Sequence, residues 1–371
     1  TAPTTRPPLE LPLMTVALYL HIPSPPWESP HTAEALVTTL AEEAAHYGTS
    51  PVAEAAVETL YIGGGRPSAL PIPALRRLLG ACRASFDTGA VREVTLELHP
   101  NDASPTLLDA LAPLGITRLS VGAPSPAAAD TDALPAWMRS IRRVRAAGRR
   151  LSVDLALPPT HPARTAWNAR LHRIVDLRVP HVALHERPSA ATDERADARA
   201  ADRLAFAMRF LAAKGYQPYT LTHFARPGHR SYYQTHTYAH GNILGLGPGA
   251  ESFWWPSRDA PSTARRWSNA NAPAAYVSQS QTGFPPVAAH DPLDRRALAR
   301  EYLLLRLRTA KGLDLDVLAH RYDTALHRRA SAALGRLRAE GLIHDVPDRV
   351  RLTPRGRLLT DAITRRLMRR T

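Results

Sequence analysis

Strand-length apolar segments alternate with helix-length segments over most of the chain, and this alternation limits the folds that it can adopt. Strand candidates occur at residues 15–22, 57–62, 93–98, 117–123, 150–157 and 180–186. Helical spacing of apolar residues occurs between them, at residues 31–48, 134–147, 165–177 and 194–214 among others. Repeated strand–helix units predict a parallel sheet covered by helices. Six or so units favour an α/β fold with a complete or partial TIM-type barrel over residues 15–223.

Unusual polar and glycine residues follow the strand candidates at their carboxyl ends. These residues are His21, Gly63 to Arg66, Glu97, His99, Asp154, His185 and Glu186. In parallel barrels the carboxyl ends of the strands share one edge, and binding sites form there. We therefore expect a pocket at that edge.

Composition and cysteine usage narrow the class of protein. Of the 371 residues, 44% are hydrophobic, which is enough for a sizeable core. The longest apolar runs have the length of strands, so the sequence predicts no membrane-spanning helix, and residues 1–14 do not resemble a signal peptide. One cysteine, Cys82, excludes an internal disulfide and any site that needs several thiolates. A reducing cytoplasm is the simplest compartment.

The chain is strongly basic. Its 47 Lys and Arg residues against 33 Asp and Glu residues give a net charge of +14. Such a charge attracts polyanions, which include nucleic acids, anionic membrane surfaces and acidic ligands such as porphyrin propionates. The abundance of Ala, Arg and Pro also fits a coding bias toward GC-rich codons. The sequence leaves both explanations open.

The last third of the chain differs from the strand–helix part in the periodicity of its apolar residues. Residues 1–14 and 224–290 show little periodicity and predict irregular structure. From residue 291 amphipathic helices return, with a hairpin candidate within residues 342–353 and a final basic helix. Helices followed by a two-stranded wing predict a winged-helix-like module over residues 291–371. A basic helix in such a module is also a feature of DNA-binding proteins.

An ordered set of motifs resembles one known family. The segments LYLHIP, ETLYIGGGRPS, VTLELHP, GITRLSVGAPS, SVDLALP, THFARPGHRS and GLGPGAESF occur in that order. Together they resemble the oxygen-independent coproporphyrinogen III oxidase family of radical SAM proteins, and in particular its HemW-type haem chaperones. The resemblance covers nearly the whole chain. In that family the C-terminal module has no role in DNA binding, so nucleic acid is not an expected partner.

The resemblance also shows where this chain departs from its family. The family carries three cysteines in a C-x-x-x-C-x-x-C motif after His-Ile-Pro, and they hold a 4Fe–4S cluster that chelates SAM. The corresponding positions here are Pro25, Ser29 and Thr32. Proline offers no ligand atom, and neutral hydroxyls are poor ligands for iron–sulfur clusters. The resemblance therefore implies a protein without a cluster and without radical SAM chemistry, that is, a pseudoenzyme.

The family's SAM pocket is only partly retained. Gly63, Gly64 and Gly65 match its glycine turn, although Arg66 replaces the usual threonine. Glu97 and Asp154 match its acidic residues at strand ends. Without an iron atom to chelate the methionyl group, SAM would lose its main anchor, so we expect these five residues to be vestigial. A purely structural role, in which the same residues shape the barrel, explains them equally well.

A haem-linked motif of the HemW-type proteins falls on residues 232–240, and its histidine is absent here. Tyr233 and Tyr238 lie at motif positions, and His229, His236 and His240 are close by. Histidine and tyrosinate are both axial haem ligands. The five residues are therefore candidate haem ligands in a loop, although in a chain with 16 histidines they also fit surface or capping roles.

Three functional hypotheses follow from the sequence. The first is a HemW-like protein without a cluster that binds haem or a related tetrapyrrole and delivers it to an acceptor protein at the inner face of the membrane. The second is an enzyme whose SAM or porphyrin pocket has been put to a new use. The third is a regulatory or scaffold protein without a small ligand.

Overall fold

The computed structural model describes residues 14–24, 30–124, 133–157, 163–186, 194–257, 263–281 and 285–369. Its main feature is a twelve-stranded sheet in the order β12-β11-β10-β9-β1-β2-β3-β4-β5-β6-β8-β7. The parallel strands at its centre are β1 (Thr15–Ile22), β2 (Ala56–Gly64), β3 (Glu93–Leu98), β4 (Arg118–Gly122), β5 (Arg150–Leu157), β6 (His181–Glu186) and β9 (Asn242–Leu246). The α/β fold and the parallel strand order expected from the sequence are confirmed.

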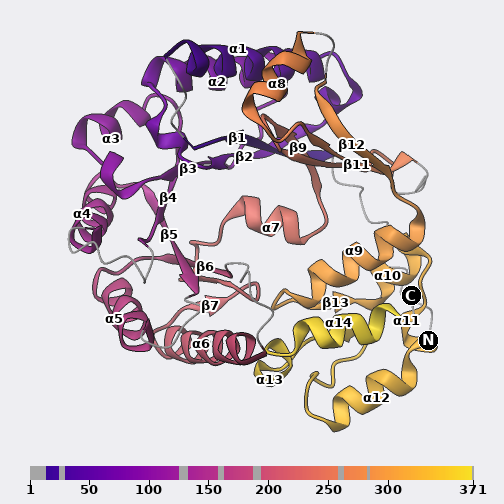
Figure 1. Cartoon of the computed structure of the whole chain (residues 1–371). Helices are drawn as coiled ribbons and strands as arrows, with labels where there is room; N and C mark the ends of the chain where they lie inside the picture. Colours follow the sequence, from indigo (N-terminus) through magenta and orange to yellow (C-terminus); the bar gives the residue numbers. More distant parts are fainter. Residues whose placement is uncertain are drawn as a thin grey trace, which may run out of the picture.

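Helices cover the outer face of the curved sheet. They are α1 (Pro30–Tyr47), α2 (Ile72–Ser85), α3 (Pro105–Leu111), α4 (Ala133–Ala146), α5 (Ala163–Asp176) and α6 (Glu194–Ala213). Figure 1 shows the sheet curving around a short helix, α7 (Tyr232–Tyr238), which lies in the middle of the molecule. Among the described strands no pairing joins β7 (Gln217–Pro218) to β12 (Val287–Pro292), so the barrel is partial and open.

The expectation that residues 224–290 are irregular is wrong. Apart from α7 and β9, this stretch contains β8 (His223–Ala225), β10 (Glu251–Trp254), β11 (Arg265–Asn269), α8 (Pro273–Ser280) and β12. The strands β10 to β12 pair antiparallel and extend the sheet beyond β9. They are only four to six residues long and do not alternate regularly between apolar and polar residues, so no local periodicity marks them. Pairing with strands from elsewhere in the chain holds them in place.

A buried carboxyl group fastens this extension to the first helix. Glu43 of α1 has no solvent exposure. It accepts hydrogen bonds from the backbone N–H of Gly247 (2.8 Å), from the amide of Asn269 (2.7 Å) and from the hydroxyl of Tyr276 (2.6 Å). Burial raises the pKa of Glu43 to about 7, which shows how strongly the site disfavours a free charge.

The C-terminal part packs as a second core beside the barrel. It contains α9 (Arg295–Leu307), β13 (Leu313–Asp314), α10 (Leu315–Tyr322), α11 (Leu326–Arg329), α12 (Ser331–Ala339), β14 (Arg349–Val350), α13 (Pro354–Arg357) and α14 (Thr360–Met368). The hairpin expected within residues 342–353 is reduced to a single bridge between Ile343 and Leu352, because β14 pairs with β13 instead. Within the described residues no helix has both the length and the apolar composition to cross a bilayer.

Candidate functional site

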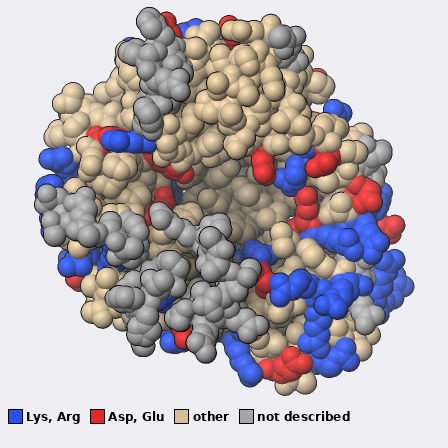
Figure 2. All heavy atoms as spheres, viewed as in Figure 1, with Lys and Arg blue, Asp and Glu red and all other residues tan. Residues whose placement is uncertain are grey.

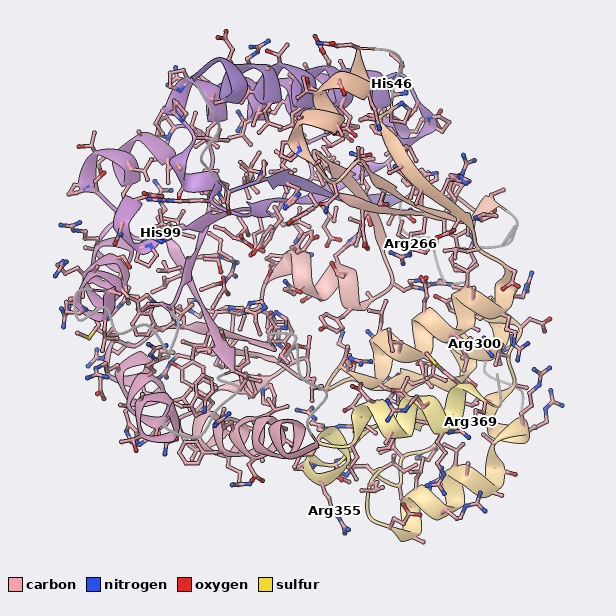
Figure 3. The ribbon with its side chains drawn as sticks, viewed as in Figure 1. His46, His99, Arg266, Arg300, Arg355 and Arg369 are labelled. Atoms are coloured by element: carbon pink, nitrogen blue, oxygen red, sulfur yellow. The ribbon has the colours of Figure 1, made fainter. Side chains whose placement is uncertain are left out.

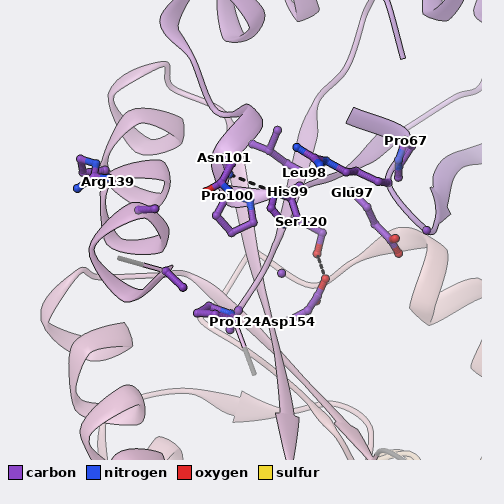
Figure 4. Close-up of a pocket in the computed structure, with 16 residues that line it drawn as sticks. Pro67, Glu97, Leu98, His99, Pro100, Asn101, Ser120, Pro124, Arg139 and Asp154 are labelled. Atoms are coloured by element: carbon purple, nitrogen blue, oxygen red, sulfur yellow. Dashed lines mark hydrogen bonds between the residues drawn. The ribbon is translucent and has the colours of Figure 1, made fainter. Parts of the chain in front are cut away.

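A cavity of about 590 Å³ opens at the carboxyl ends of β2 to β5, the edge at which the sequence predicts a pocket. Gly65, Glu97, Ser120 and Asp154 line it from consecutive strands or the turns that follow them, and α4 closes it from the side with Arg139. Figure 4 shows Glu97, Ser120, Asp154 and Arg139 among the residues that line the cavity. We call it the strand-end cavity. The twist of the parallel sheet brings these residues together, although they are spread over almost 90 positions.

Two carboxyl groups define the electrostatics of this cavity. Glu97 accepts a hydrogen bond from the Tyr61 hydroxyl (2.8 Å) and another from the backbone N–H of Gly64 (3.1 Å). Burial, together with the negative charge of Asp154, raises the pKa of Glu97 to about 7. Asp154 accepts a hydrogen bond from the Ser120 hydroxyl (2.7 Å; Figure 4). The cavity therefore holds two carboxyl groups, of which Glu97 is readily protonated.

A histidine lies next to the same pair of carboxyl groups. The His185 Nε2 atom is 3.7 Å from a carboxylate oxygen of Asp154. Hydrogen bonding to Asp154 raises the pKa of His185 above its ordinary value. This arrangement suits a cationic or proton-donating ligand group better than an anionic one.

The glycine turn is explained by the packing of the chain itself. Gly64 has a φ of +112°, and a Cβ atom there would lie 2.2 Å from the His21 ring. A Cβ atom on Gly65 would lie 2.1 Å from the backbone nitrogen of Ser24, and one on Gly63 would lie 2.9 Å from a Glu97 carboxylate oxygen. Of the three glycines, Gly65 lines the strand-end cavity. The turn is therefore required for close packing of β1 against β2 whether or not a ligand binds.

The side chain in place of the family's threonine is held at the rim of the cavity. Arg66 lines it and forms a two-point ion pair with Asp102, in which its Nε atom lies 3.0 Å from a carboxylate oxygen. The Ser68 hydroxyl donates to the same oxygen (2.6 Å) and accepts from the backbone N–H of His99 (3.0 Å). This network joins the turn after β2 to the turn after β3.

The expectation of a loop at residues 229–240 is wrong, because α7 occupies most of it. The hydroxyl of Ser231 caps the helix by accepting from the backbone N–H of Gln234 (3.3 Å). Tyr233 projects toward the strand-end residues, with its ring centroid 4.6 Å from that of Tyr61 and 6.2 Å from that of Tyr19. One candidate haem ligand thus reaches the neighbourhood of Glu97.

Two candidate histidines point elsewhere and have both ring nitrogens engaged. His236 is bonded to a Glu58 carboxylate oxygen (2.9 Å) and to the backbone carbonyl of Asn242 (2.8 Å). His240 is bonded to the Tyr322 hydroxyl (2.8 Å) and to a Glu301 carboxylate oxygen (3.2 Å). Both are buried. Either histidine would have to give up a hydrogen bond to coordinate an iron atom.

The remaining two candidates lie apart from each other. Tyr238 has its ring centroid 6.0 Å from that of His223. His229 lies at the opposite edge of the barrel from the strand-end cavity, and its Nδ1 atom is buried without a hydrogen-bond partner among the described residues. Burial and the positive charges of nearby arginines lower the pKa of His229, which keeps it neutral. The five candidates do not converge on one point.

The positions expected to have lost the cluster ligands are largely outside the described residues. Pro25 and Ser29 lie there, and for Thr32 only the backbone, in α1, is described. The single cysteine, Cys82, is 1% exposed in the core-facing side of α2, and burial raises its pKa to about 12. Within the described part of the chain, no three His, Cys, Asp or Glu side chains are grouped as a metal site.

Sequence reasoning missed Tyr61, Ser120 and His223 as residues of this region. A usable signal existed for the first two, because each lies two residues before a strand-end glycine and so shares its face of the sheet. His223 lies in an antiparallel strand, and its pKa is lowered to about 4 by burial. No local pattern indicates that it faces the barrel interior.

Comparisons with known proteins agree with this architecture. The model of the HemN C-terminal domain matches residues 293–359. The heme chaperone HemW of Mycobacterium tuberculosis (strain ATCC 25618 / H37Rv) is 29% identical over 338 residues, covering 84% of this chain and 81% of that protein. The heme chaperone HemW of Lactococcus lactis subsp. lactis is 22% identical, covering 81% of this chain and 82% of that protein.

A solved structure has the same fold over nearly the whole chain. The coproporphyrinogen III oxidase HemN of Escherichia coli, described as a radical SAM enzyme, superimposes with a TM-score of 0.75. Its sequence identity is 21%, and the match covers 95% of this chain and 90% of that one. The match to the HemN C-terminal domain, the likeness to the HemW proteins and the HemN-like fold together support the relationship to the HemW and HemN proteins that the sequence motifs indicate.

Proposed function

We propose that this chain binds haem or a related tetrapyrrole in the manner of a haem-handling protein and performs no radical SAM chemistry. The observation that carries the second half of the proposal is the position of its one cysteine. A cluster of the family type needs three thiolates. The 371 residues contain Cys82 alone, and its thiol is buried and protonated at neutral pH. The residues present do not fit a 4Fe–4S cluster.

Haem as the ligand class is supported by relatives that are named heme chaperones over more than four fifths of this chain. His229 and Tyr233 are the preferred axial ligands of the five candidates. His229 is neutral and has a free Nδ1 atom, and Tyr233 lies beside the strand-end cavity. His236 and His240 rank below them because they already have partners at both nitrogens. Tyr238 ranks below Tyr233 because its ring lies against His223. Delivery to an acceptor protein at the inner face of the membrane, from a cytoplasmic location, extends this proposal and is tested by co-purification.

Anaerobic reconstitution tests the loss of cluster chemistry. Incubation of the purified protein with iron and sulfide should leave no 4Fe–4S absorption after desalting, because no set of thiolates exists to hold a cluster. The Cys82→Ala variant is the matched control and should give the same spectrum. A stoichiometric cluster in the parent protein would refute this half of the proposal.

Titration with haem, followed by its Soret absorption, tests the ligand. We expect saturable binding, with the band shifted in His229→Ala or in Tyr233→Phe and unchanged in a variant of the exposed His320. Loss of one axial ligand should weaken binding by about tenfold, which corresponds to roughly 1.4 kcal/mol. Absence of binding in the parent protein would remove the haem hypothesis. Binding that neither substitution alters would remove these two ligands from it.

A second candidate function is SAM binding without a cluster, and the acidic strand-end cavity is the observation that favours it. Its carboxyl groups, Glu97 and Asp154, suit the amino group and the sulfonium charge of SAM. Calorimetric titration with SAM separates the two candidates. Heat of binding that disappears in Asp154→Asn would favour a repurposed SAM pocket, and no heat in the parent protein would favour the haem proposal.

A further inference from the structure

A second large cavity, of about 690 Å³, lies at the amino-terminal edge of the barrel, opposite the strand-end cavity. Three turns enclose it: the turn between α4 and β5, the turn between α5 and β6, and residues 226–229 after β8. Leu151, Val175 and Pro180 form its apolar wall. We call it the arginine cavity, because Arg145, Arg149, Arg178 and Arg226 line it.

The positive charge of this cavity is not balanced from within the protein. No carboxylate is among its lining residues. In the part of the chain that the structure describes, none of the four guanidinium groups takes part in an ion pair. Arginine side chains at a protein surface usually spread apart or pair with acids, because like charges repel. Four of them around one cavity indicate a site for an anion.

Hydrogen bonds to the protein hold some of these arginines in place and leave donors free. Arg145 donates to the backbone carbonyl of Leu177 (2.7 Å), and Arg149 donates to that of Ile116 (3.2 Å). The Arg226 guanidinium lies 4.9 Å from the centre of the Tyr216 ring. The Nε atoms of Arg149 and Arg226, and the Nδ1 atom of His229, are nevertheless buried without a partner among the described residues. Buried polar atoms without partners are costly and rare, so three nitrogen atoms of this kind around one cavity point to a ligand.

The backbone at Arg178 supplies an independent observation. Arg178 follows α5 in the left-handed region, with a φ of 51°. The turns after α3, α4 and α6 have a glycine in the left-handed region: Gly148 and Gly215 lie two residues after their helices, as Arg178 does, and Gly115 lies four residues after α3. Glycine adopts this conformation without strain, whereas an arginine is strained there. Of these four positions, those of Gly148 and Arg178 border the cavity, and Arg178 places a guanidinium group there in spite of the backbone strain.

We propose that the arginine cavity binds a small molecule that carries two or more phosphate groups. Guanidinium groups match phosphate oxygens through paired N–H donors. One phosphate has at most two negative charges, so four arginines from three separate turns call for a second phosphate group. The inference concerns other chemistry than the proposed haem function, but the two share His229, which lines this cavity. Haem on His229 and a diphosphate in the arginine cavity would therefore exclude each other, whereas haem on Tyr233 would not affect the cavity.

Calorimetric titration of the full-length protein with inorganic pyrophosphate is the first test. We expect saturable binding, weakened by about tenfold in Arg178→Gly because one charge-assisted contact is lost. The same variant should unfold at an equal or higher temperature, because glycine removes the backbone strain. A variant that loses affinity without losing stability cannot be explained by misfolding.

Two control variants separate the site from general effects. Asp348 is exposed and also has a positive φ, of 55°, so Asp348→Gly relieves the same kind of strain away from the cavity and should leave the affinity unchanged. Arg76 is exposed on α2, so Arg76→Gln removes one positive charge elsewhere and should change the affinity by less than about twofold. If Arg76→Gln weakens binding as much as Arg178→Gly, the attraction is non-specific and the proposal is wrong.

Competition experiments identify the source of the phosphate groups. ADP should displace pyrophosphate from the cavity. If ADP binds more tightly than pyrophosphate, the ligand is a nucleotide. If the two affinities are equal, the cavity recognises the diphosphate group itself. AMP, with one phosphate, should bind at least about tenfold more weakly. No saturable pyrophosphate binding would overturn the inference in favour of no site, and displacement of pyrophosphate by equimolar citrate would overturn it in favour of a carboxylate site.

Discussion

At the scale of single residues, Glu97 shows how the fold sets the chemistry of the strand-end cavity. Its carboxyl group is held by the Tyr61 hydroxyl and the Gly64 N–H, yet burial and the neighbouring charge of Asp154 raise its pKa to about 7. A carboxyl group whose pKa is raised by folding binds its proton more tightly in the folded state than in the unfolded state. Its ionisation therefore destabilises the protein as the pH rises from about 4.5 to about 7.

The Glu97→Gln substitution should remove this pH dependence. Between pH 5 and pH 8, the free energy of unfolding of the variant should rise relative to that of the parent protein by up to about 3 kcal/mol. Glu43 titrates in the same range in both proteins, so its contribution cancels in the comparison. Urea unfolding at the two pH values measures the change, and Glu34→Gln, at an exposed position, is the control. Parallel pH profiles for parent and Glu97→Gln would show that Glu97 ionises normally.

At the scale of elements, α7 is fastened to the amino-terminal edge of the barrel by a buried ion pair. The Nε atom of Arg118 lies 2.7 Å from a carboxylate oxygen of Glu93, and both side chains are at most 1% exposed. Glu93 also accepts from the Ser231 hydroxyl (2.9 Å) and from the backbone N–H of Tyr232 (3.1 Å). Arg118 donates to the carbonyl groups of residues 229 and 230, just before the helix. One pair therefore joins β3 and β4 to α7.

Breaking this pair on one side should destabilise the whole barrel. Glu93→Gln leaves the Arg118 charge buried without a counter-charge, and we expect a loss of about 3–5 kcal/mol in the free energy of unfolding. The double variant Glu93→Gln, Arg118→Met should recover part of that loss, because the unpaired charge is gone. Chemical denaturation of the three proteins measures both effects. A loss below about 1 kcal/mol in the single variant would mean that solvent reaches the pair.

At the scale of the whole molecule, the strand β10 belongs to the barrel sheet and also contributes to the C-terminal core. The C-terminal core includes Phe253 and Trp255, from β10 and the residue after it, and Ala264, which precedes β11. Trp255 and Phe253 also approach the buried His240 ring, at centroid distances of 6.3 Å and 4.5 Å. The match to the HemN C-terminal domain begins at residue 293, so the packed unit extends beyond it toward the barrel.

A fragment of residues 291–371 should therefore not fold on its own. It lacks the side chains of Phe253 and Trp255, whose removal from a core typically costs about 3–5 kcal/mol each. We expect helical far-UV circular dichroism without a fixed near-UV signal and without a cooperative thermal transition. A cooperative transition in the fragment would show that the second core is complete without the barrel.

The net charge is also distributed unevenly over the molecule. Residues 291–371 contain 19 of the 47 basic and 10 of the 33 acidic residues, which leaves 28 and 23 for the first 290 residues. The C-terminal part thus has +9 of the +14, and Figure 2 shows Lys and Arg gathered over its helices at the lower right. Arg300, Arg355 and Arg369 all belong to this region (Figure 3). A uniform coding bias does not explain such a concentration.

Cation-exchange chromatography tests this distribution. Replacement of Arg328, Arg336 and Arg351 by Gln should lower the salt concentration for elution more than replacement of three exposed arginines on the barrel, Arg76, Arg77 and Arg142. Clustered charges bind a charged matrix together, whereas scattered charges do not. Equal shifts for the two triple variants would contradict a localised basic surface.

Much of the barrel was predictable from the sequence, for a local reason. A buried parallel strand is apolar throughout, a covering helix is apolar on one face, and both patterns are legible within ten to twenty residues. Their order places Glu97 and Asp154 at the carboxyl ends of strands, and the strand-end cavity contains both. The cysteine count likewise follows from the sequence alone.

Only the tertiary structure determines the partners of individual side chains. His236 is bonded to Glu58, which is 178 positions away, and His240 is bonded to Tyr322, which is 82 positions away, so neither histidine is the free ligand that its motif suggested. The strands of residues 251–292 and the arginine cavity arise in the same way, from segments that are distant in the chain. The physical reason is that periodicity records which face of an element is buried, whereas the curvature of the sheet decides what that face meets.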